Sequence, residues 1–222
     1  MIDFKLLIIG FLGLISFYFL YKEFREILFL KRKLKEIIGK SRIEVIEDLV
    51  KIKNYLQSNI TYNANLKNQT RPLLRHTATQ ILKSNYGFCG ENARAAIKLF
   101  MIGGARARRV YLFRKEWQHV LIEHKFKGKW YMFDGHYDPS SLLTDEAVST
   151  ILSEEISLYP NDYKTNPYLD YCRVKLFYKI GFFKPFAKIK LPQMLIYIAE
   201  SPFLIKGCLT GLLLIITLTI IL

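Results

Sequence analysis

The 222-residue chain has only three cysteines, and no two of them lie close together. Cys89, Cys172 and Cys208 are odd in number and widely spaced, which excludes the disulfide framework of a small secreted domain. No cysteine or histidine pair has the spacing of a structural zinc site. The sequence therefore predicts a reducing compartment and no metal.

The chain also lacks internal repeats, low-complexity linkers and any basic, aromatic recognition motif of the kind that nucleic-acid-binding folds carry. Acidic residues are scarce, with 19 Asp and Glu against 33 Lys and Arg, for a net charge of +14. Much of this positive charge lies beside two apolar runs at the chain ends. The position of this charge predicts that the protein binds a lipid bilayer with anionic lipid and does not bind nucleic acid.

Each end of the chain carries a long apolar run. Residues 4–21 are interrupted only by Lys5 and have about the length that spans a bilayer core, roughly 20 residues. A cleaved signal peptide is the alternative, but "FYFLYKEF" offers no small-residue cleavage site, so we expect a retained anchor. Residues 202–222 are long enough for a second span if Lys206 snorkels to the headgroups. A buried tail or a re-entrant helix is the alternative there.

Basic residues flank both runs on the side that faces the middle of the chain. They are Lys22, Arg25, Lys31, Arg32, Lys33, Lys35 and Lys40 after the first run, and Lys179, Lys184, Lys188, Lys190 and Lys206 before or within the second. The positive-inside rule then predicts an integral membrane protein whose middle domain is cytoplasmic.

The middle of the chain changes its periodicity once. Helical spacing of apolar residues predicts helices over residues 41–60, 71–87 and 91–104, the last ended by Gly103 and Gly104. Short segments rich in aromatic and β-branched residues follow at 107–114, 119–126 and 129–136, the last two joined by a turn at Gly128. A further helix is expected over 144–158. The pattern predicts an α+β domain with its principal helix packed on an antiparallel sheet.

Cys89 lies between glycines in "YGFCGENARAAIKLFMIGG", directly before the third predicted helix. A helix N-terminus favours the thiolate, which is the nucleophilic form of cysteine. A lone cysteine beside an amphipathic helix is also commonly a packed core residue, so this position alone does not decide its role.

Two further residues could complete a site around this thiol. His119 opens the second predicted strand, and Asp134 ends the third, across the turn at Gly128. An aspartate there would orient the imidazole, which would pair with the thiol. His136 and Asp138 are alternative members, although the spacing from the preceding tryptophan favours Asp134. His124 falls on the opposite strand face and is expected to be exposed.

The segments "YGFCGENARAAIKLFMIGGARARRVYL" and "QHVLIEHKFKGKWYMFD" resemble the catalytic core of the transglutaminase-like superfamily, which includes papain-like thiol proteases, peptide N-glycanases and transglutaminases. The residues that fit the family order are Gly87, Cys89, Gly104, Ala105, Arg106, His119, Glu123, Trp130 and Asp134. "CGE" is similar to the glycanase-like branch. Val120 and Leu121 depart from the small residue and tryptophan that commonly follow the family histidine, which could alter the substrate groove.

The resemblance implies a papain/transglutaminase-like α+β core with a Cys89–His119–Asp134 triad that attacks an amide bond, without a metal or an organic cofactor. A cysteine peptidase or amidase acting on a peptide or protein substrate at the membrane surface is the first expectation. A protein-glutamine acyltransferase that cross-links proteins is the second, and a non-catalytic peptide-binding or membrane scaffold module is the third. The Cys89 N–H is one expected oxyanion donor, and the second stays open among Gln80, Asn85, Trp117 and Gln118.

These predictions divide the chain into five parts. They are a transmembrane anchor (1–22), a basic juxtamembrane and helical segment (23–70), a transglutaminase-like catalytic domain (71–170), a basic aromatic membrane-interface segment (171–201) and a second transmembrane helix (202–222). An ordinary domain edge is the alternative for 171–201.

Overall fold

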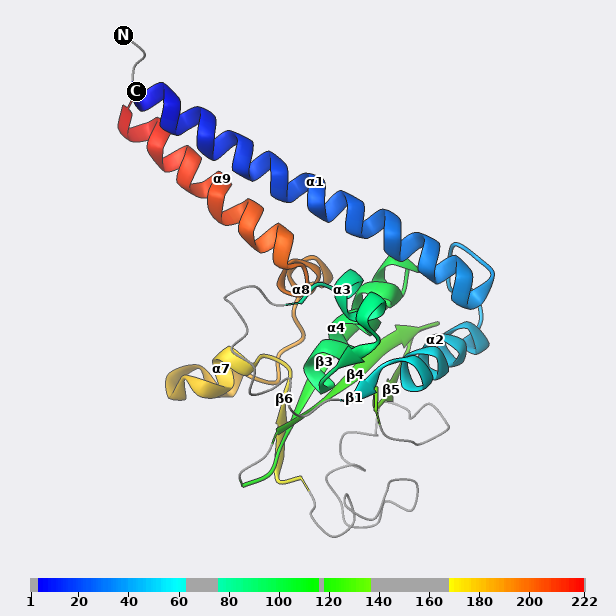
Figure 1. The fold of residues 1–222 in the computed structure, drawn as a ribbon. Coiled ribbons are helices and arrows are strands. Elements are labelled where there is room, and N and C mark those ends of the chain that lie inside the picture. Colours follow the sequence, from blue (N-terminus) through cyan, green and yellow to red (C-terminus); the bar gives the residue numbers. More distant parts are fainter. Residues whose placement is uncertain (1–3, 63–75, 116–117, 137–167, 222) are drawn as a thin grey trace.

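The computed structural model describes residues 4–62, 76–115, 118–136 and 168–221. Two long helices, α1 (Phe4–Ile38) and α9 (Pro202–Ile221), extend together from a mixed domain of helices and strands. The start of α1 and the end of α9 lie together at the end of this helical pair that is far from the domain (Figure 1). Both helices therefore reach the domain at the same end of the pair.

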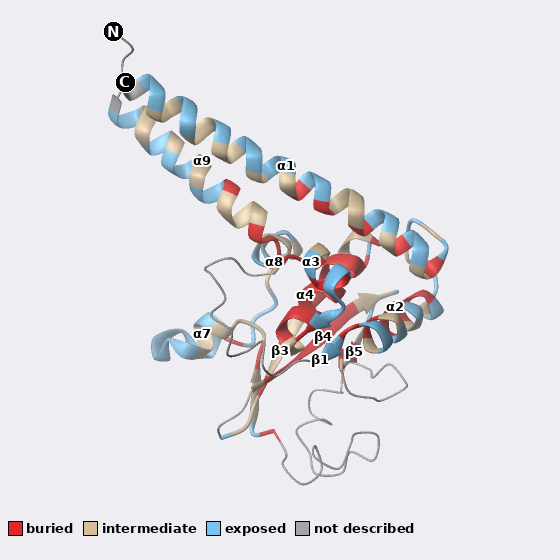
Figure 2. Cartoon of the chain, in the orientation of Figure 1, coloured by how far each residue is buried: buried red, intermediate tan, exposed pale blue. Residues whose placement is uncertain are grey.

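The two long helices are the candidate membrane spans. They are long and apolar enough to cross a membrane over Leu6–Ile38 and Pro202–Ile220. Small residues let them pack closely, since the Ser16 hydroxyl donates to the Gly207 carbonyl at 3.3 Å and Gly211 also faces Ser16. Their outer parts expose apolar side chains, whereas buried residues gather in the domain (Figure 2).

Helix α1 runs without a break through the expected boundary at residue 22. Its second half packs on the domain, where Leu30 and Leu34 are fully buried. The first part of the chain is thus one continuous helix that joins a candidate span to the domain core.

Helix α4 (Cys89–Ile102) is the centre of the domain, as Figure 2 shows. It is buried on all sides from Gly90 to Phe100, because α1, α2 (Ile46–Asn59), α3 (Ala78–Ser84), α8 (Gln193–Glu200) and the sheet surround it. Its end at Gly103, followed by Gly104 with φ +89°, agrees with the sequence.

A four-stranded antiparallel sheet packs against α4, in the order β5-β4-β3-β6. Its strands are β3 (Arg106–Phe113), β4 (Gln118–Phe126), β5 (Lys129–Phe133) and β6 (Asp170–Cys172). The predicted turn at Gly128 is present, with φ of 44° at Lys127 and 87° at Gly128, as a tight hairpin turn requires. The predicted α+β fold with its helix on an antiparallel sheet is confirmed.

Shorter elements complete the domain. Strands β1 (Thr61–Tyr62) and β2 (Tyr86–Gly87) form a small parallel pair just before α4. After β6 come α7 (Lys175–Lys179) and the 3-10 helix η2 (Gly181–Phe186). Helix α7 projects away from the sheet, and the chain then continues through α8 into α9 (Figure 1). The helix expected over 144–158 lies outside the described residues.

Candidate active site

Cys89 is the first residue of α4. Phe88 before it is extended, with φ −94° and ψ 172°, and its carbonyl accepts the N–H groups of Glu91 and Asn92 at 2.8 and 3.0 Å. The helix therefore starts directly at the thiol. The Cys89 side chain is partly buried against the core, and its backbone N–H belongs to the first turn, where amides have no acceptor within the helix.

His119 and Asp134 meet across the β4–β5 hairpin. His119 Nε2 lies 2.5 Å from Asp134 Oδ2, and the two side chains are 1% and 0% exposed. In the strand register Ile122 pairs with Phe133, so Asp134 follows one residue further and reaches His119 diagonally. The second carboxylate oxygen of Asp134 accepts the His136 N–H at 2.9 Å. The aspartate is thus fixed on both oxygens.

The His119 ring also contacts the Cys89 thiol. Burial alone would lower the pKa of His119, but the charge of Asp134, its hydrogen bond and the hydrogen bond with Cys89 raise that pKa to about 10. Since Nε2 is bound to Asp134, Nδ1 is the nitrogen left for the thiol. The Asp134 carboxylate thus stabilises the positively charged form of the His119 ring beside Cys89.

Two side-chain amides hold the loop that carries Asp134. The Gln57 side chain on α2 donates to the Asp134 carbonyl at 2.9 Å, and the Asn92 side chain on α4 donates to the Gly135 carbonyl at 2.6 Å. A Cβ atom at Gly135 would lie 2.7 Å from the Asn92 carboxamide, so only glycine allows this approach. Sequence reasoning missed both amides. Gln57 lies far along the chain from the other site residues, and nothing in the sequence around Asn92, three residues after Cys89, indicates its partner at Gly135.

The four candidates for the second oxyanion donor lie in different places. Gln80 closes the N-terminal cap of α3, where its Oε1 accepts the Thr77 N–H at 2.8 Å. Asn85 ends α3 in the left-handed conformation and is exposed. Gln118 lines a cavity of about 300 Å³ together with Phe88 and Gly90, the neighbours of Cys89. Trp117 lies outside the described residues.

The other histidines near the site differ from the expectations. His124 is fully buried rather than exposed, because it stacks between Phe100 of α4 and Tyr131 of β5. Burial lowers the pKa of His124 to about 3, so the ring is neutral. His136 packs edge-on against Tyr62, and its backbone N–H donates to Asp134. Asp138, the other alternative, lies outside the described residues.

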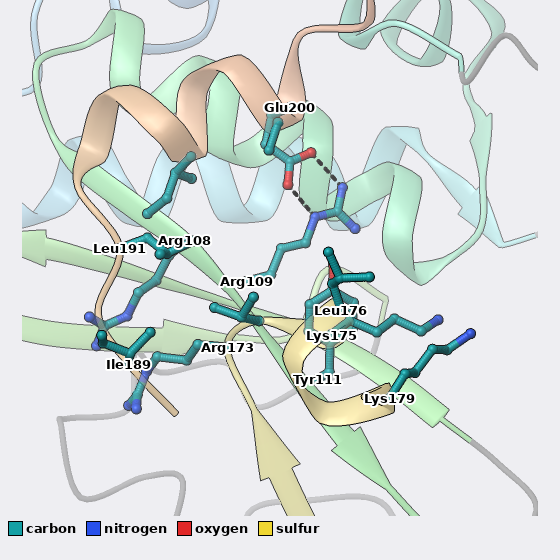
Figure 3. A pocket seen from close by; sticks show the side chains of 13 residues that line it. Arg108, Arg109, Tyr111, Arg173, Lys175, Leu176, Lys179, Ile189, Leu191 and Glu200 are labelled. Carbon is teal, nitrogen blue, oxygen red and sulfur yellow. Dashed lines mark hydrogen bonds and ion pairs between the residues drawn. The ribbon is translucent and has the colours of Figure 1, made fainter. Parts of the chain in front are cut away.

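Sequence reasoning also missed two cations near the thiol. Arg109 on β3 and Lys175 on α7 both lie within electrostatic range of Cys89. The Arg109 guanidinium binds both carboxylate oxygens of Glu200, with its Nη2 2.6 Å from Oε2 (Figure 3). Arg94 of α4 approaches the same carboxylate at 3.4 Å. The end of α8, next to α9, is therefore bound to the residues around the site.

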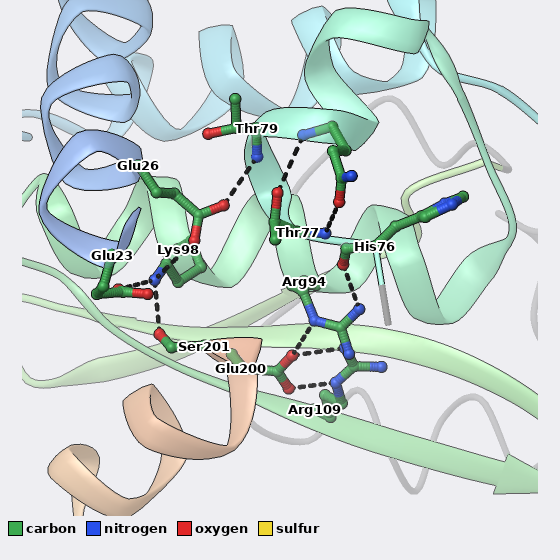
Figure 4. Close-up of polar contacts among 11 residues, drawn as sticks. Glu23, Glu26, His76, Thr77, Thr79, Arg94, Lys98, Arg109, Glu200 and Ser201 are labelled. Atoms are coloured by element: carbon green, nitrogen blue, oxygen red, sulfur yellow. Dashed lines mark hydrogen bonds and ion pairs between the residues drawn. The ribbon is translucent and has the colours of Figure 1, made fainter. Parts of the chain in front are cut away.

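A second buried polar cluster joins α4 to both long helices. Lys98 Nζ lies 2.5 Å from Glu23 Oε1 and 3.4 Å from Glu26 Oε2 on α1 (Figure 4). It also lies 2.6 Å from the Ser201 hydroxyl, between α8 and α9, and 3.2 Å from the Tyr197 hydroxyl. The helix that begins with Cys89 is thus tied to both candidate spans.

Comparison with known proteins confirms the resemblance seen in the sequence. Residues 32–135 match the sequence model of the transglutaminase-like superfamily. The match includes α2, which sequence reasoning had placed ahead of the catalytic domain, and it includes Cys89, His119 and Asp134. No curated protein sequence matches the chain.

One of the solved structures that match this chain is that of a candidate cysteine protease from Cytophaga hutchinsonii. It is 20% identical in sequence, with a TM-score of 0.40, over 59% of this chain and 45% of that chain. The matched region thus spans less than half of that protein. Within the part of this chain that the structure describes, no group of three or more His, Cys, Asp or Glu side chains could hold a metal ion.

Proposed function

We propose that this protein is a membrane-anchored thiol enzyme that hydrolyses an amide bond, a cysteine peptidase or amidase. The observation that carries the proposal is the buried His119–Asp134 contact beside a thiol that starts a helix. The superfamily match supports a cysteine-dependent enzyme at the level of the family. Hydrolysis is the simpler reaction because water is always present, whereas transfer to an amine requires a site that excludes water.

The proposed reaction starts from a thiolate–imidazolium pair of Cys89 and His119. The Cys89 thiolate attacks the amide carbonyl carbon, and the Cys89 N–H donates to the oxygen that becomes negative. The His119 imidazolium gives its proton to the amide nitrogen as the carbon–nitrogen bond breaks, which releases the amine and leaves a thioester. Neutral His119 then takes a proton from water, whose oxygen attacks the thioester. The acid leaves, and the thiolate–imidazolium pair is restored.

Asp134 acts in this scheme through His119. It holds the ring with Nδ1 toward the thiol and stabilises the imidazolium in each half of the reaction. Gln118 is the second oxyanion donor that we propose, because it lines the cavity next to Cys89 while Gln80 and Asn85 belong to the ends of α3.

A substrate screen tests the proposal. The full chain in lipid nanodiscs is incubated with a peptide library and a fluorescent primary amine, and mass spectrometry follows the products. We expect new carboxylates to outnumber amine adducts, and Cys89→Ala to reduce both by at least about a thousandfold. A majority of amine adducts at glutamine would establish the acyltransferase instead. Products that form equally in Cys89→Ala would refute the thiol mechanism.

We further propose that the domain faces the cytoplasm, with α1 and α9 crossing the membrane as a helical pair. The basic residues that flank both apolar runs support this orientation. A membrane-impermeant maleimide should label Cys89 in opened cells and leave it unlabelled in intact cells. Labelling of Cys89 in intact cells would place the domain on the other side.

A further inference from the structure

A second cavity, of about 410 Å³, lies between β3 and the segment that leads into α9. Five basic residues and one acidic residue line it, namely Arg108, Arg109, Arg173, Lys175, Lys179 and Glu200 (Figure 3). Leu176 and Leu191 are among its apolar residues. It shares Arg109, Tyr111 and Lys175 with the smaller cavity next to Cys89. A molecule held here would therefore lie beside the entrance to the candidate active site.

The charges around this cavity do not balance. Arg173 shares the Glu123 carboxylate with Arg108, and Arg109 is paired with Glu200. Lys175 and Lys179 form no ion pair with any residue that the structure describes. Lys175 is half-buried, and Lys179 and Arg109 repel its charge. An anionic group in the cavity would relieve this repulsion.

The surroundings of the cavity indicate which anion it takes. Its wall includes α8, which runs directly into the candidate span α9, and α7, which continues into η2. Large apolar side chains project from this region into solvent, with Phe182 83% and Met194 74% exposed. Lysines alternate with these apolar residues, as in segments that lie on a membrane surface. A lipid offers both a phosphate for the cations and an acyl chain for the apolar wall.

We propose that this cavity binds the headgroup of an anionic phospholipid. The phosphate lies between Lys175, Lys179 and Arg109, and the start of the acyl chain lies against Leu176 and Leu191. This binding goes beyond the enzymatic proposal and does not depend on it, since Lys175, Lys179 and Arg109 are not members of the proposed triad. A bound headgroup narrows the route to Cys89 from the membrane side.

Native mass spectrometry of the full chain released from detergent micelles tests the proposal. The probes are phosphatidylglycerol, phosphatidylcholine and inorganic phosphate, each added in a titration. We expect one saturable site for phosphatidylglycerol and at least about tenfold weaker binding of phosphatidylcholine. Equal binding of the two lipids would overturn the proposal. Inorganic phosphate that binds as tightly as phosphatidylglycerol would identify a free-phosphate site and would overturn it as well.

Paired variants locate the site. The double variant Lys175→Gln/Lys179→Gln should weaken phosphatidylglycerol binding by about tenfold or more. Lys184→Gln/Lys190→Gln removes the same charge from the same segment but outside the cavity lining, and should change binding by less than about twofold. Equal losses in both pairs would reduce the effect to general surface charge and refute the pocket.

Two further variants separate binding from folding and from catalysis. Lys179→Gln alone changes an exposed side chain, so it keeps the fold and should still weaken binding by about threefold. Cys89→Ala should bind phosphatidylglycerol as tightly as the unmodified chain. If the enzymatic proposal fails, the binding of phosphatidylglycerol is still expected. If Lys179→Gln and the double variant bind the lipid as tightly as the unmodified chain, the lipid site is refuted and the enzymatic proposal is unaffected.

Discussion

Replacing His119 by alanine is expected to slow the alkylation of Cys89 by iodoacetamide at pH 6 by about a hundredfold. An ordinary thiol, with a pKa of about 8.5, is only about 0.3% ionised at this pH, whereas a thiol paired with an imidazolium is mostly thiolate. The thiolate of such a pair is somewhat less nucleophilic than that of an ordinary thiol. The expected ratio of the two alkylation rates is therefore smaller than the ratio of the ionised fractions.

The structure gives the physical basis for this expectation. His119 is 1% exposed, and its contacts with Asp134 and Cys89 raise its pKa to about 10, so the ring is positively charged at pH 6. Alanine removes that charge and leaves the thiol with only the helix terminus and the more distant Arg109 and Lys175. Arg109 is held in place by Glu200, and both cations remain in the variant.

The measurement needs a chain in which only one thiol reacts. Cys172 and Cys208 are replaced beforehand, and the rate is followed by mass spectrometry in mild detergent from pH 5 to pH 9. His124→Phe is the matched control, because it changes a buried histidine on the other face of the same strand and keeps the stacking on Phe100. It should alter the rate by less than about twofold. Equal rates for His119→Ala and the unmodified chain would refute the ion pair and would favour a non-catalytic binding module instead.

The same substitution carries a stability prediction whose sign follows from the raised pKa. The pKa of His119 in the folded chain is about 10, and the ordinary pKa of a histidine is 6.5. The folded state therefore binds the His119 proton more tightly than the unfolded state does. The contribution of this charged ring to the free energy of unfolding is complete below about pH 6.5. It is lost as the pH rises toward 10. The stability difference between the unmodified chain and His119→Ala should shrink over that window.

The parts of the site that depend on local sequence were predictable. The hairpin between β4 and β5 follows from two β-rich segments around Gly128, and it fixes how far His119 lies from Asp134. A helix that begins close to Cys89 follows from the glycines and from the apolar spacing, although α4 begins at Cys89 and the prediction began at residue 91. Each of these patterns lies within about twenty residues, so the residues themselves specify the geometry.

The partners that come from distant parts of the chain were not predictable in this way. Glu200 binds Arg109 across 91 residues, and nothing in the spacing of either residue indicates the other. His124 shows the same limit, because alternation along the strand predicted an exposed side chain whereas the ring stacks on Phe100 of α4. Which face of a sheet is covered depends on how α4 packs, and no single segment encodes that.

Lys98→Ala is expected to lower the free energy of unfolding by about 3–5 kcal/mol, a large share of the 5–15 kcal/mol typical of a folded domain. Lys98 is fully buried, and its ammonium group lies 2.5 Å from Glu23 and 3.4 Å from Glu26. Its removal leaves two carboxylates in the protein interior without a cation. Because their burial is then no longer compensated by an opposite charge, the folded state is strongly destabilised. Thermal and denaturant unfolding in detergent, followed by circular dichroism, measure the change.

Three variants separate the charge from the packing. Lys83→Ala removes an exposed lysine from the neighbouring helix α3 and should cost less than about 1 kcal/mol. Lys98→Met/Glu23→Gln keeps the volume and removes one charge of each sign, so it should recover a good part of the loss, whereas Lys98→Met alone should not. If Lys98→Met were as stable as the double variant, the buried charge of Glu23 would not matter. Since Lys98 lies on the helix that begins with Cys89 and Glu23 lies on the helix of the first candidate span, the loss of the pair should also loosen the connection between the candidate active site and the membrane helices.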